Sequence, residues 1–257
     1  MNSLLAPMHV SLARNFCRCH RTILFTCHPA LTLMAEHRSP VNAGIGHPKS
    51  YYCDEFVKKE RFLLETCMYF PFTAAKNLCG FGEEPDALLS RFSHLQMILI
   101  LVLDKARHEN RITIDRKGNP KVYYRIDSDI RHAFVRAMQA GAEIFFASGA
   151  YRAHIPASEN FFTYADQADR LEEVISSRHF KSGQISLSAA HMMGGCRMGT
   201  DPKTSVCNSW GKVHGFDHLY VADASLFPDS AEVNPYLTIM ALADRVAEGI
   251  RRDLGFE

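Results

Sequence analysis

Residues 191–199 read HMMGGCRMG, and residues 222–243 read ADASLFPDSAEVNPYLTIMALA. We interpret HLYVADASLF, residues 218–227, as a strand that ends in a turn of small residues. A helix is expected to begin at Asn234-Pro235, because Asn is a favoured N-cap and Pro a favoured first helical residue. Its expected buried stripe consists of Ile239, Leu242, Ala243, Val246 and Ile250.

The small-residue turn and the helix N-terminus together favour an anionic ligand. The turn lets a ligand approach the backbone, and the first N–H groups of a helix carry positive potential. A phosphate would suit this place, and so would the edge of a flavin, which becomes negative when it accepts a hydride. If His191 lies beside Asn234, the imidazole can take an alcohol proton and the amide can hold the oxygen. The combination indicates an alcohol-oxidising site.

Each of these residues also has an ordinary structural interpretation. His191 can be a histidine in a turn, Asn234 can be only a helix cap, and Asp223 can be only a turn cap. Their conjunction in one order along the chain is what favours the functional interpretation.

Composition and charge exclude several classes of partner. The 257-residue chain is 47% hydrophobic and 22% charged, with a formal net charge of +1. No whole-chain field therefore directs it to nucleic acid or to an acidic membrane. The longest apolar run, Met97–Leu103, is far shorter than the roughly 20 residues of a membrane span, so no transmembrane segment is expected. The first residues lack a basic segment before an apolar one, which predicts a cytoplasmic chain.

Cysteine spacing gives no sign of a disulfide framework or a metal site. The eight cysteines follow no regular spacing, so free thiols are expected. Cys17, Cys19 and His20 lie close together, with Cys27 and His28 shortly after, but their spacing matches no usual zinc motif. We expect no metal.

Three regions follow from the hydrophobic pattern. Residues 1–40 show no clean period and are expected to be irregular. Residues 41–190 are expected to form an α+β domain with strands and helices packed on one face, and residues 191–257 hold the motifs above. The elements expected in the middle region are a strand at 94–106, a hairpin at 111–126 turning at 117–120, a helix at 127–146 capped by Asp127 or Ser128, a strand at 151–157 and a surface helix at 164–177.

The C-terminal motifs resemble those of the glucose-methanol-choline (GMC) oxidoreductases. The matching pieces are HMMGGCRMG, GKVHGFDHLYVADASLFP and VNPYLTIMALADRVAEGI, together about sixty residues, and PVNAGIGHPKSYYCDEF matches more diffusely. The form of VNPYLTIMALA is closer to the cholesterol oxidase and long-chain alcohol oxidase branches than to the sugar oxidases. The resemblance implies a GMC-type substrate domain with an antiparallel sheet, plus the C-terminal strand and helix of an FAD-binding α/β domain.

The resemblance also implies roles for individual residues. His191 matches the active-site base and Asn234 its partner on the substrate oxygen. Asp223 and Ala224 match the turn that touches the ribityl and pyrophosphate part of FAD, and Pro235 and Tyr236 match the backbone against the flavin ring. Thr238 is a further carry-over, although its hydroxyl can instead bond within the first helical turn. The implied reaction is oxidation of the CH–OH group of an alcohol, with hydride transfer to FAD.

One family feature is missing from the sequence. The glycines at 44–46 and 80–82 do not complete Gly-x-Gly-x-x-Gly, so the chain has no cradle for the ADP end of FAD. We therefore expect a C-terminal portion of a GMC enzyme, with a separate chain as one source of the FAD-binding half. The expected partner is a small-molecule alcohol, hydrophobic in view of the family branch and of aromatic side chains in the middle region: Phe70, Phe72, Phe92, Phe145, Phe161 and Phe162. The alternative is a non-catalytic remnant or binding module that keeps the substrate-domain fold.

Overall fold

The computed structural model describes residues 24–47, 49–67, 70–75, 77–78, 82–156, 161–180 and 185–256. The chain divides into two compact units, each built from segments that are distant in the sequence. Unit 1 comprises residues 1–28, 104–125 and 190–257, and unit 2 comprises residues 29–103 and 126–189. The hairpin at 111–126, expected within the middle region, therefore belongs almost entirely to the unit that carries the C-terminal motifs.

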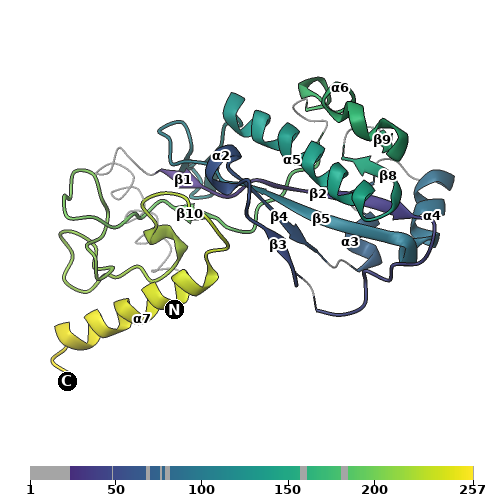
Figure 1. Ribbon diagram of the computed structural model, residues 1–257. Helices are drawn as coiled ribbons and strands as arrows, with labels where there is room; N and C mark the ends of the chain where they lie inside the picture. Colours follow the sequence, from purple (N-terminus) through teal and green to yellow (C-terminus); the bar gives the residue numbers. More distant parts are fainter. Residues whose placement is uncertain are drawn as a thin grey trace. The chain divides into compact units, whose positions relative to one another are not determined.

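Unit 2 is built around a six-stranded antiparallel sheet of order β3-β4-β5-β2-β8-β9 (Figure 1). The strands are β2 Ala30–His37, β3 Tyr52–Cys53, β4 Phe62–Thr66, β5 Leu95–Val102, β8 Ala150–Ile155 and β9 Phe161–Tyr164. β5 and β8 confirm the strands expected at 94–106 and 151–157. In β5 every residue except Gln96 is buried, which is why the strand shows a continuous apolar run and no alternation.

Helix α5, Ser128–Ala147, covers one face of this sheet (Figure 1). It confirms the helix expected at 127–146, and Asp127 is the N-cap, because its Oδ1 accepts the N–H of Ile130 at 2.9 Å. A Cβ on Gly141 would lie 2.6 Å from Cδ1 of Leu33, so the helix approaches β2 closely. An apolar stripe at three- and four-residue steps is buried, with at most 5% exposure at Ile130, Phe134, Ala137 and Met138.

Short helical segments cover the other face. Side chains such as Met34, Met97 and Leu63 alternate with those that face α5 and form a second apolar cluster. The segments that contribute to this cluster are α2 Val57–Glu60, α3 Pro71–Ala75, α4 Glu83–Ser90 and η1 Phe92–His94. The fold class is therefore α+β, as expected. The expectation that helices pack on one face only is wrong, because the long helix covers one face and short helices cover the other.

Two expectations for unit 2 are wrong. Residues 30–37, expected to be irregular, form β2, which pairs with β5 on one side and β8 on the other. A strand buried on both faces lacks the alternation that would have marked it. The single helix expected at 164–177 is instead η2 Ala165–Arg170, α6 Leu171–Val174 and η3 Ser177–His179, because the chain turns extended at the fully buried Ile175.

Unit 1 has little regular structure. It contains β1 Phe25–Thr26 paired with β10 Met193–Gly194, the hairpin of β6 Arg111–Ile114 and β7 Pro120–Tyr123, η4 Ala224–Leu226 and α7 Tyr236–Asp253. The expected hairpin is confirmed, and its turn is held by Oδ1 of Asp115, which accepts from the N–H groups of Lys117 and Asn119. The apolar stripe of α7 packs on a small core: Val246 is 2% exposed, and the partly buried Leu242 and Ile250 join it.

The strand expected at 218–227 is wrong. Within the described residues, this stretch contributes an isolated bridge from Tyr220 to Lys212 and then turns into η4. The carboxylate of Asp223 accepts from both the N–H and the hydroxyl of Ser225, at 2.8 and 2.5 Å. This local bonding replaces a strand ladder with a turn.

None of the helices in the described part of the chain is both long and apolar enough to cross a bilayer.

Candidate functional site

A two-residue strand pair brings the N-terminal part of the described chain beside the glycine pair of HMMGGCRMG. Phe25 pairs with Gly194 and Thr26 with Met193. Gly194 has a φ of +78°, and a Cβ there would lie 2.4 Å from the carbonyl oxygen of Leu24, so no side chain fits. The pairing places His28 and His191 together, because each lies two residues outside its strand.

The same glycine-rich segment also runs along the turn of small residues. The N–H of Cys196 donates to the carbonyl of Ser225 at 2.9 Å, and the N–H of Met198 donates to that of Leu226 at 2.9 Å. The structure therefore brings together two motifs that are about thirty residues apart in the sequence.

His28 and His191 form the centre of the site. Their Nδ1 atoms are 3.1 Å apart, and the rings meet edge to face with centroids 5.2 Å apart. His28 is fully buried, whereas His191 is partly exposed. The Nε2 of His28 lies 2.7 Å from the carbonyl oxygen of Ala231. A carbonyl only accepts hydrogen bonds, so this nitrogen of His28 carries a proton.

A buried carboxylate holds the backbone around His28. Asp104 is 2% exposed, and its two oxygens accept the N–H groups of Cys27 at 3.0 Å and His28 at 3.2 Å. The hydroxyls of Tyr124, at 2.8 Å, and Ser230, at 3.2 Å, donate to the same carboxylate. These bonds hold His28 at a φ of +45°, a left-handed conformation that is uncommon outside glycine.

Burial shifts the ionisation of this cluster toward neutral forms. It raises the pKa of Asp104, and the four hydrogen bonds offset only part of that effect. Burial, followed by the charge of Asp104, raises the pKa of Cys27 to about 12 and raises the pKa of Tyr124 as well. Cys27 is therefore a protonated thiol at neutral pH and not a nucleophile.

The segment that leads to Asn234 is anchored to the same cluster. Oδ1 of Asp229 accepts from the N–H of Ala106 at 2.6 Å, and Ser230 bonds to Asp104. The carbonyl of Ala231 then meets His28, and Asn234 follows three residues later. His191 and the partly buried Asn234 are thus linked through His28 and Ala231.

Asn234 does not cap α7. The carbonyl of Pro235 accepts the first helical bond, from Ile239 at 2.8 Å, so Pro235 is the N-cap and the helix starts at Tyr236. The expectation that Asn234 would be the cap is wrong by one residue, because the φ of −84° and ψ of −3° at Pro235 already lie in the helical region. The Asn234 amide is therefore not engaged as a helix cap.

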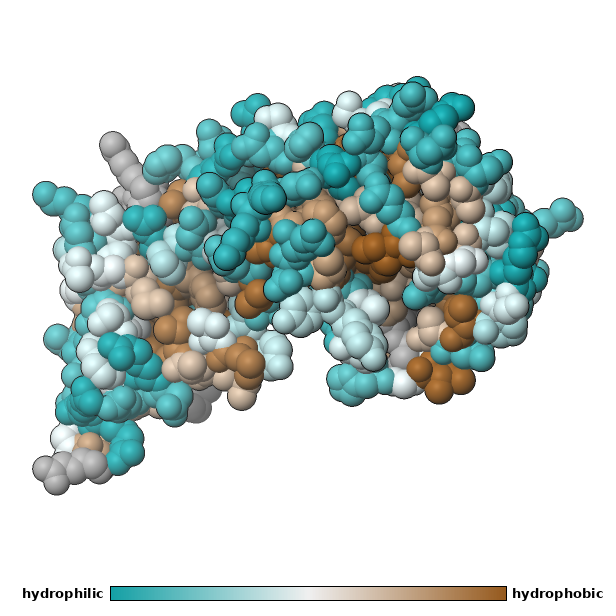
Figure 2. Space-filling view, in the orientation of Figure 1, coloured by the Kyte–Doolittle hydropathy of each residue, from teal (hydrophilic) through white to brown (hydrophobic). Residues whose placement is uncertain are grey.

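The first turn of α7 is open to a ligand. Among the described residues, no side chain caps it and no acidic residue lies within it, and Tyr236 and Thr238 are exposed. Figure 2 shows hydrophobic side chains gathered over this end of the helix, where Leu237 and Met240 are both 64% exposed. N–H donors with positive potential beside an apolar surface fit the edge and face of a flavin ring.

The other two expected cofactor residues lie in the turn. Asp223 is exposed and is the N-cap of η4, where it engages Ser225. Ala224 is the first residue of η4 and is partly buried. The structural interpretation of Asp223 as a turn cap is thus confirmed, while its role toward a cofactor remains a prediction.

The sequence interpretation missed His28 and Asp104. His28 entered only as an imagined zinc ligand, and Asp104 only as the end of a strand. The available signal was the position of Asp104, the first charged residue after the buried run MILILVL. Residues that directly follow a buried strand often belong to functional sites. Within the described residues no cluster of three or more His, Cys, Asp or Glu could hold a metal, and Cys17, Cys19 and His20 lie outside those residues.

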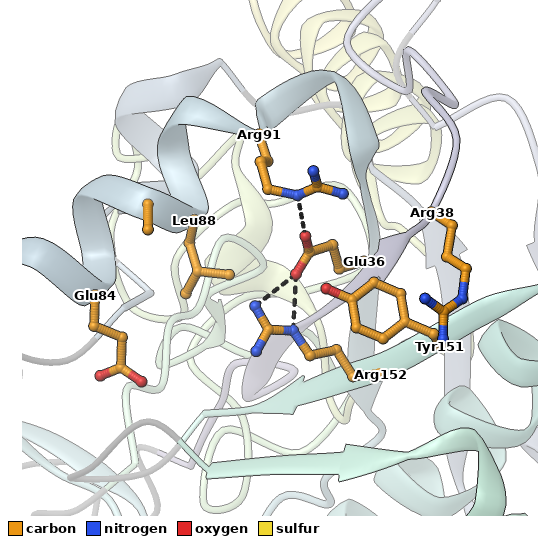
Figure 3. Close-up of a pocket in the computed structure, with 8 residues that line it drawn as sticks. Glu36, Arg38, Glu84, Leu88, Arg91, Tyr151 and Arg152 are labelled. Atoms are coloured by element: carbon orange, nitrogen blue, oxygen red, sulfur yellow. Dashed lines mark hydrogen bonds and ion pairs between the residues drawn. The ribbon is translucent and has the colours of Figure 1, made fainter.

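A cavity of about 460 Å³ in unit 2 carries a second buried carboxylate (Figure 3). The carboxylate of Glu36 accepts from Nε and Nη2 of Arg152, at 2.8 and 2.6 Å, and from Nε of Arg91. Burial alone would raise the pKa of Glu36, but hydrogen bonds from Tyr151 and the two arginines lower it below its ordinary value. Because these groups satisfy one another, we interpret the cluster as an attachment of the end of α4 to the sheet.

Comparison with known proteins identifies the family. The model of the C-terminal region of the GMC oxidoreductases matches residues 106–243, more than half of the chain. An uncharacterised GMC-type oxidoreductase of Mycobacterium tuberculosis is 28% identical over 223 residues, which are 86% of this chain and 34% of that protein. A long-chain-alcohol oxidase of Arabidopsis thaliana is 29% identical over 178 residues, 67% of this chain and 23% of that protein. Paromamine 6'-oxidase of Streptomyces fradiae is 42% identical over 76 residues, 30% of this chain and 14% of that protein.

Solved structures show the same fold. Formate oxidase of Aspergillus oryzae, in a structure that concerns modification of its FAD, has a TM-score of 0.60 at 12% identity and matches 91% of this chain and 48% of its own. Pyridoxine 4-oxidase of Mesorbium loti has a TM-score of 0.55 at 16% identity, with 91% and 44% covered. The chain thus spans less than half the length of these proteins and about a third or less of the curated relatives above. This chain belongs to the GMC oxidoreductase family.

Proposed function

We propose that this chain is the active-site and substrate-domain part of an FAD-dependent oxidoreductase that oxidises the CH–OH group of an alcohol. The observation that carries the proposal is the pairing of His191 with the buried His28, anchored beside the segment that leads to Asn234 and α7. This arrangement holds an imidazole in a fixed position near an open helix N-terminus, as proton removal beside a flavin requires.

The residues that would hold the flavin are those of the turn and of the first turn of α7. Asp223 and Ala224 would contact its ribityl and pyrophosphate part, and Pro235, Tyr236 and Thr238 would present backbone to the ring edge. When bound, FAD supplies the acceptor for the hydride that leaves the alcohol carbon. FAD is named in the structure of formate oxidase, which shares this fold.

His191 and Asn234 would act on the substrate oxygen. His191 takes the hydroxyl proton, and the Asn234 amide donates a hydrogen bond to the oxygen as negative charge develops there. The amide is available for this because it is not the cap of α7.

The ADP half of FAD would be held by residues that this sequence does not contain. Neither glycine cluster completes the dinucleotide motif, and the matched solved structures are about twice as long as the matched part. We propose that these residues belong to a preceding segment or to a separate chain.

For the substrate, we propose a hydrophobic alcohol. The match to the plant long-chain-alcohol oxidase covers 178 residues, more than residues 190–257 can supply, so it must extend into unit 2. The match to the paromamine oxidase covers 76 residues, only slightly more than the 68 residues of 190–257, so it requires little of unit 2. The aromatic residues of the middle region give mixed support: Phe145 is fully buried in the core, whereas Phe70 and Phe72 are 74% and 78% exposed. The competing substrate is a polar alcohol such as paromamine, named in that relative.

Two measurements test the proposal. On the chain itself, calorimetric titration should give weak binding with little difference between FAD and FMN, because only the flavin end has a site; tight stoichiometric binding with a strong preference for FAD would contradict the missing cradle. In an FAD-loaded assembly with the N-terminal half, His191→Ala should slow anaerobic flavin reduction by decanol about a hundredfold or more. The exposed His218→Ala is the matched control. Equal rates for the His191 variant and the parent would overturn the assignment, and faster reduction by paromamine than by decanol would overturn the substrate class.

A further inference from the structure

We infer that His28 is a positioning residue that fixes the tautomer of His191, with the proton on Nδ1 and the lone pair of the base on Nε2. This deepens the proposed function and rests on it for the catalytic role of His191, although the tautomer itself can be measured independently.

The carbonyl of Ala231 determines which nitrogen of His28 carries the proton. That oxygen lies 2.7 Å from Nε2 of His28 and can only accept, so the Nε2 of His28 carries the proton. The carbonyl is itself held in place, because Ser230 bonds to Asp104 and Asp229 bonds to the N–H of Ala106. The donor position on the His28 ring is therefore set by the fold.

The second step concerns the charge of His28. Its side chain is fully buried, and burial favours the neutral imidazole over the imidazolium. The carboxylate of Asp104 accepts from the backbone N–H of His28, whereas the two ring nitrogens of His28 meet the carbonyl of Ala231 and Nδ1 of His191. A neutral ring with a proton on Nε2 has a lone pair on Nδ1.

The tautomer of His28 determines which nitrogen of His191 carries the proton. The two Nδ1 atoms are 3.1 Å apart, within hydrogen-bond distance, and one of them must donate. Because Nδ1 of His28 holds a lone pair, Nδ1 of His191 is the donor. In its neutral state His191 then has its lone pair on Nε2, the only ring nitrogen that can accept an alcohol proton.

The backbone supports this role for His28. Its left-handed φ of +45° is costly for a residue with a Cβ, and the fold maintains it through bonds from two successive N–H groups to Asp104. A residue that only filled space would not need this geometry. The relay runs from Ala231 through His28 to His191, over three segments that are far apart in the sequence.

The test is the tautomeric state of the histidines in the ¹⁵N-labelled chain, read from long-range ¹H–¹⁵N spectra near neutral pH. We expect protonated Nδ1 and unprotonated Nε2 at His191, and the reverse at His28. His28→Gln, whose amide keeps one donor and one acceptor, should retain the His191 pattern, whereas His28→Phe should lose it. His214→Phe is the control, since His214 pairs with Ser205 elsewhere in unit 1.

Three results would overturn the inference: a proton on Nε2 of His191 in the parent chain, an imidazolium at His28, or an unchanged His191 pattern in a folded His28→Phe variant. If that variant does not fold, the spectrum of the parent chain still decides. In the FAD-loaded assembly, His28→Phe should slow flavin reduction at least about tenfold while His28→Gln recovers most of the rate. A correct tautomer together with an unimpaired His191→Ala enzyme would refute the proposed function and leave the relay intact.

Discussion

Unit 1 and unit 2 each bury a carboxylate, and the surroundings of the two differ. In unit 2, Glu36 is held by the guanidinium groups of Arg91 and Arg152, which keep it ionised (Figure 3). In unit 1, Asp104 accepts from two backbone N–H groups and two hydroxyls, and burial raises its pKa. The ion pair fastens a helix end to a sheet, whereas the Asp104 cluster positions a histidine.

The two units also differ in what stabilises them. Unit 2 has a continuous apolar core between its sheet and α5, in which Phe62, Phe134 and Phe145 are all fully buried. Unit 1 has a small apolar core under α7 and is otherwise joined by backbone bonds between irregular segments. We therefore expect substitutions in the core of unit 2 to lower stability. In unit 1 we expect that a substitution can lower activity without lowering stability.

The largest effect is expected in the core of unit 2. Phe134→Ala removes a fully buried ring that stacks on Phe180 with centroids 5.2 Å apart. The free energy of unfolding should fall by about 3–5 kcal/mol, the usual cost of such a cavity. Urea unfolding followed by circular dichroism measures it, and Ile144→Ala, on the exposed side of the same helix, is the control. A similar loss in both variants would mean that α5 does not pack as described.

The sequence predicted unit 2 well where hydrophobic burial alone decides the structure. The strand at 95–102 has a continuous apolar run, and the helix at 128–147 has an apolar stripe. No other type of secondary structure would bury these residues as fully. Strand β2 was missed because burial on both faces removes the alternation, and because His37 and Glu36 make its end look polar. Its position depends on partners that are distant in the sequence.

The next effect concerns the tight strand pair of unit 1. Gly194→Ala places a Cβ 2.4 Å from the carbonyl of Leu24 at a φ of +78°. Gly215→Ala is a matched control, because its φ is +77° and nothing lies within 4 Å of the added Cβ. The control should lose about 1–2 kcal/mol of unfolding free energy from backbone strain, and Gly194→Ala about 1–3 kcal/mol more from overpacking. Equal losses would show that β1 and β10 are not in close contact.

The site was predictable only in part. His191, Asn234 and α7 are recognisable from a motif and a helix start. Their geometry depends on His28, which no local pattern marks, and on Asp104, which is marked only by its position after the run MILILVL. The strand expected at 218–227 was wrong because a single carboxylate, that of Asp223, bends the chain by bonding to Ser225. Side-chain hydrogen bonds of this kind leave no hydrophobic period in the sequence.

Substitution of Asn234 tests whether a change in unit 1 can lower activity without lowering stability. Since Pro235 caps α7, Asn234→Ala should change the unfolding free energy by no more than about 0.5 kcal/mol. In the FAD-loaded assembly the same change should slow flavin reduction on the order of a hundredfold, the scale of a lost donor to a developing oxyanion. Chemical denaturation and stopped-flow reduction provide the two values. A loss of about 1 kcal/mol or more in stability would restore Asn234 as a cap.

The smallest effect is a difference in sign between the pH dependences of the stability that Glu36 and Asp104 contribute. The lowered pKa of Glu36 means that its contribution to stability is present above its unfolded value, about 4.3, and is lost as the pH falls through the folded value. The raised pKa of Asp104 means that its contribution is present below its unfolded value, about 3.9, and is lost as the pH rises through the folded value.

Replacing each carboxyl by its neutral amide measures the two pH dependences separately. The stability of Glu36→Gln relative to the parent should fall as the pH rises from about 3 to 5, because only the parent gains the ionised carboxylate between its arginines. The relative stability of Asp104→Asn should instead increase as the pH rises above about 4, because only the parent must ionise a carboxyl that its site prefers neutral. Urea titrations of the three proteins at matched pH values give both slopes. Slopes of the same sign would mean that burial does not raise the pKa of Asp104 in the fold.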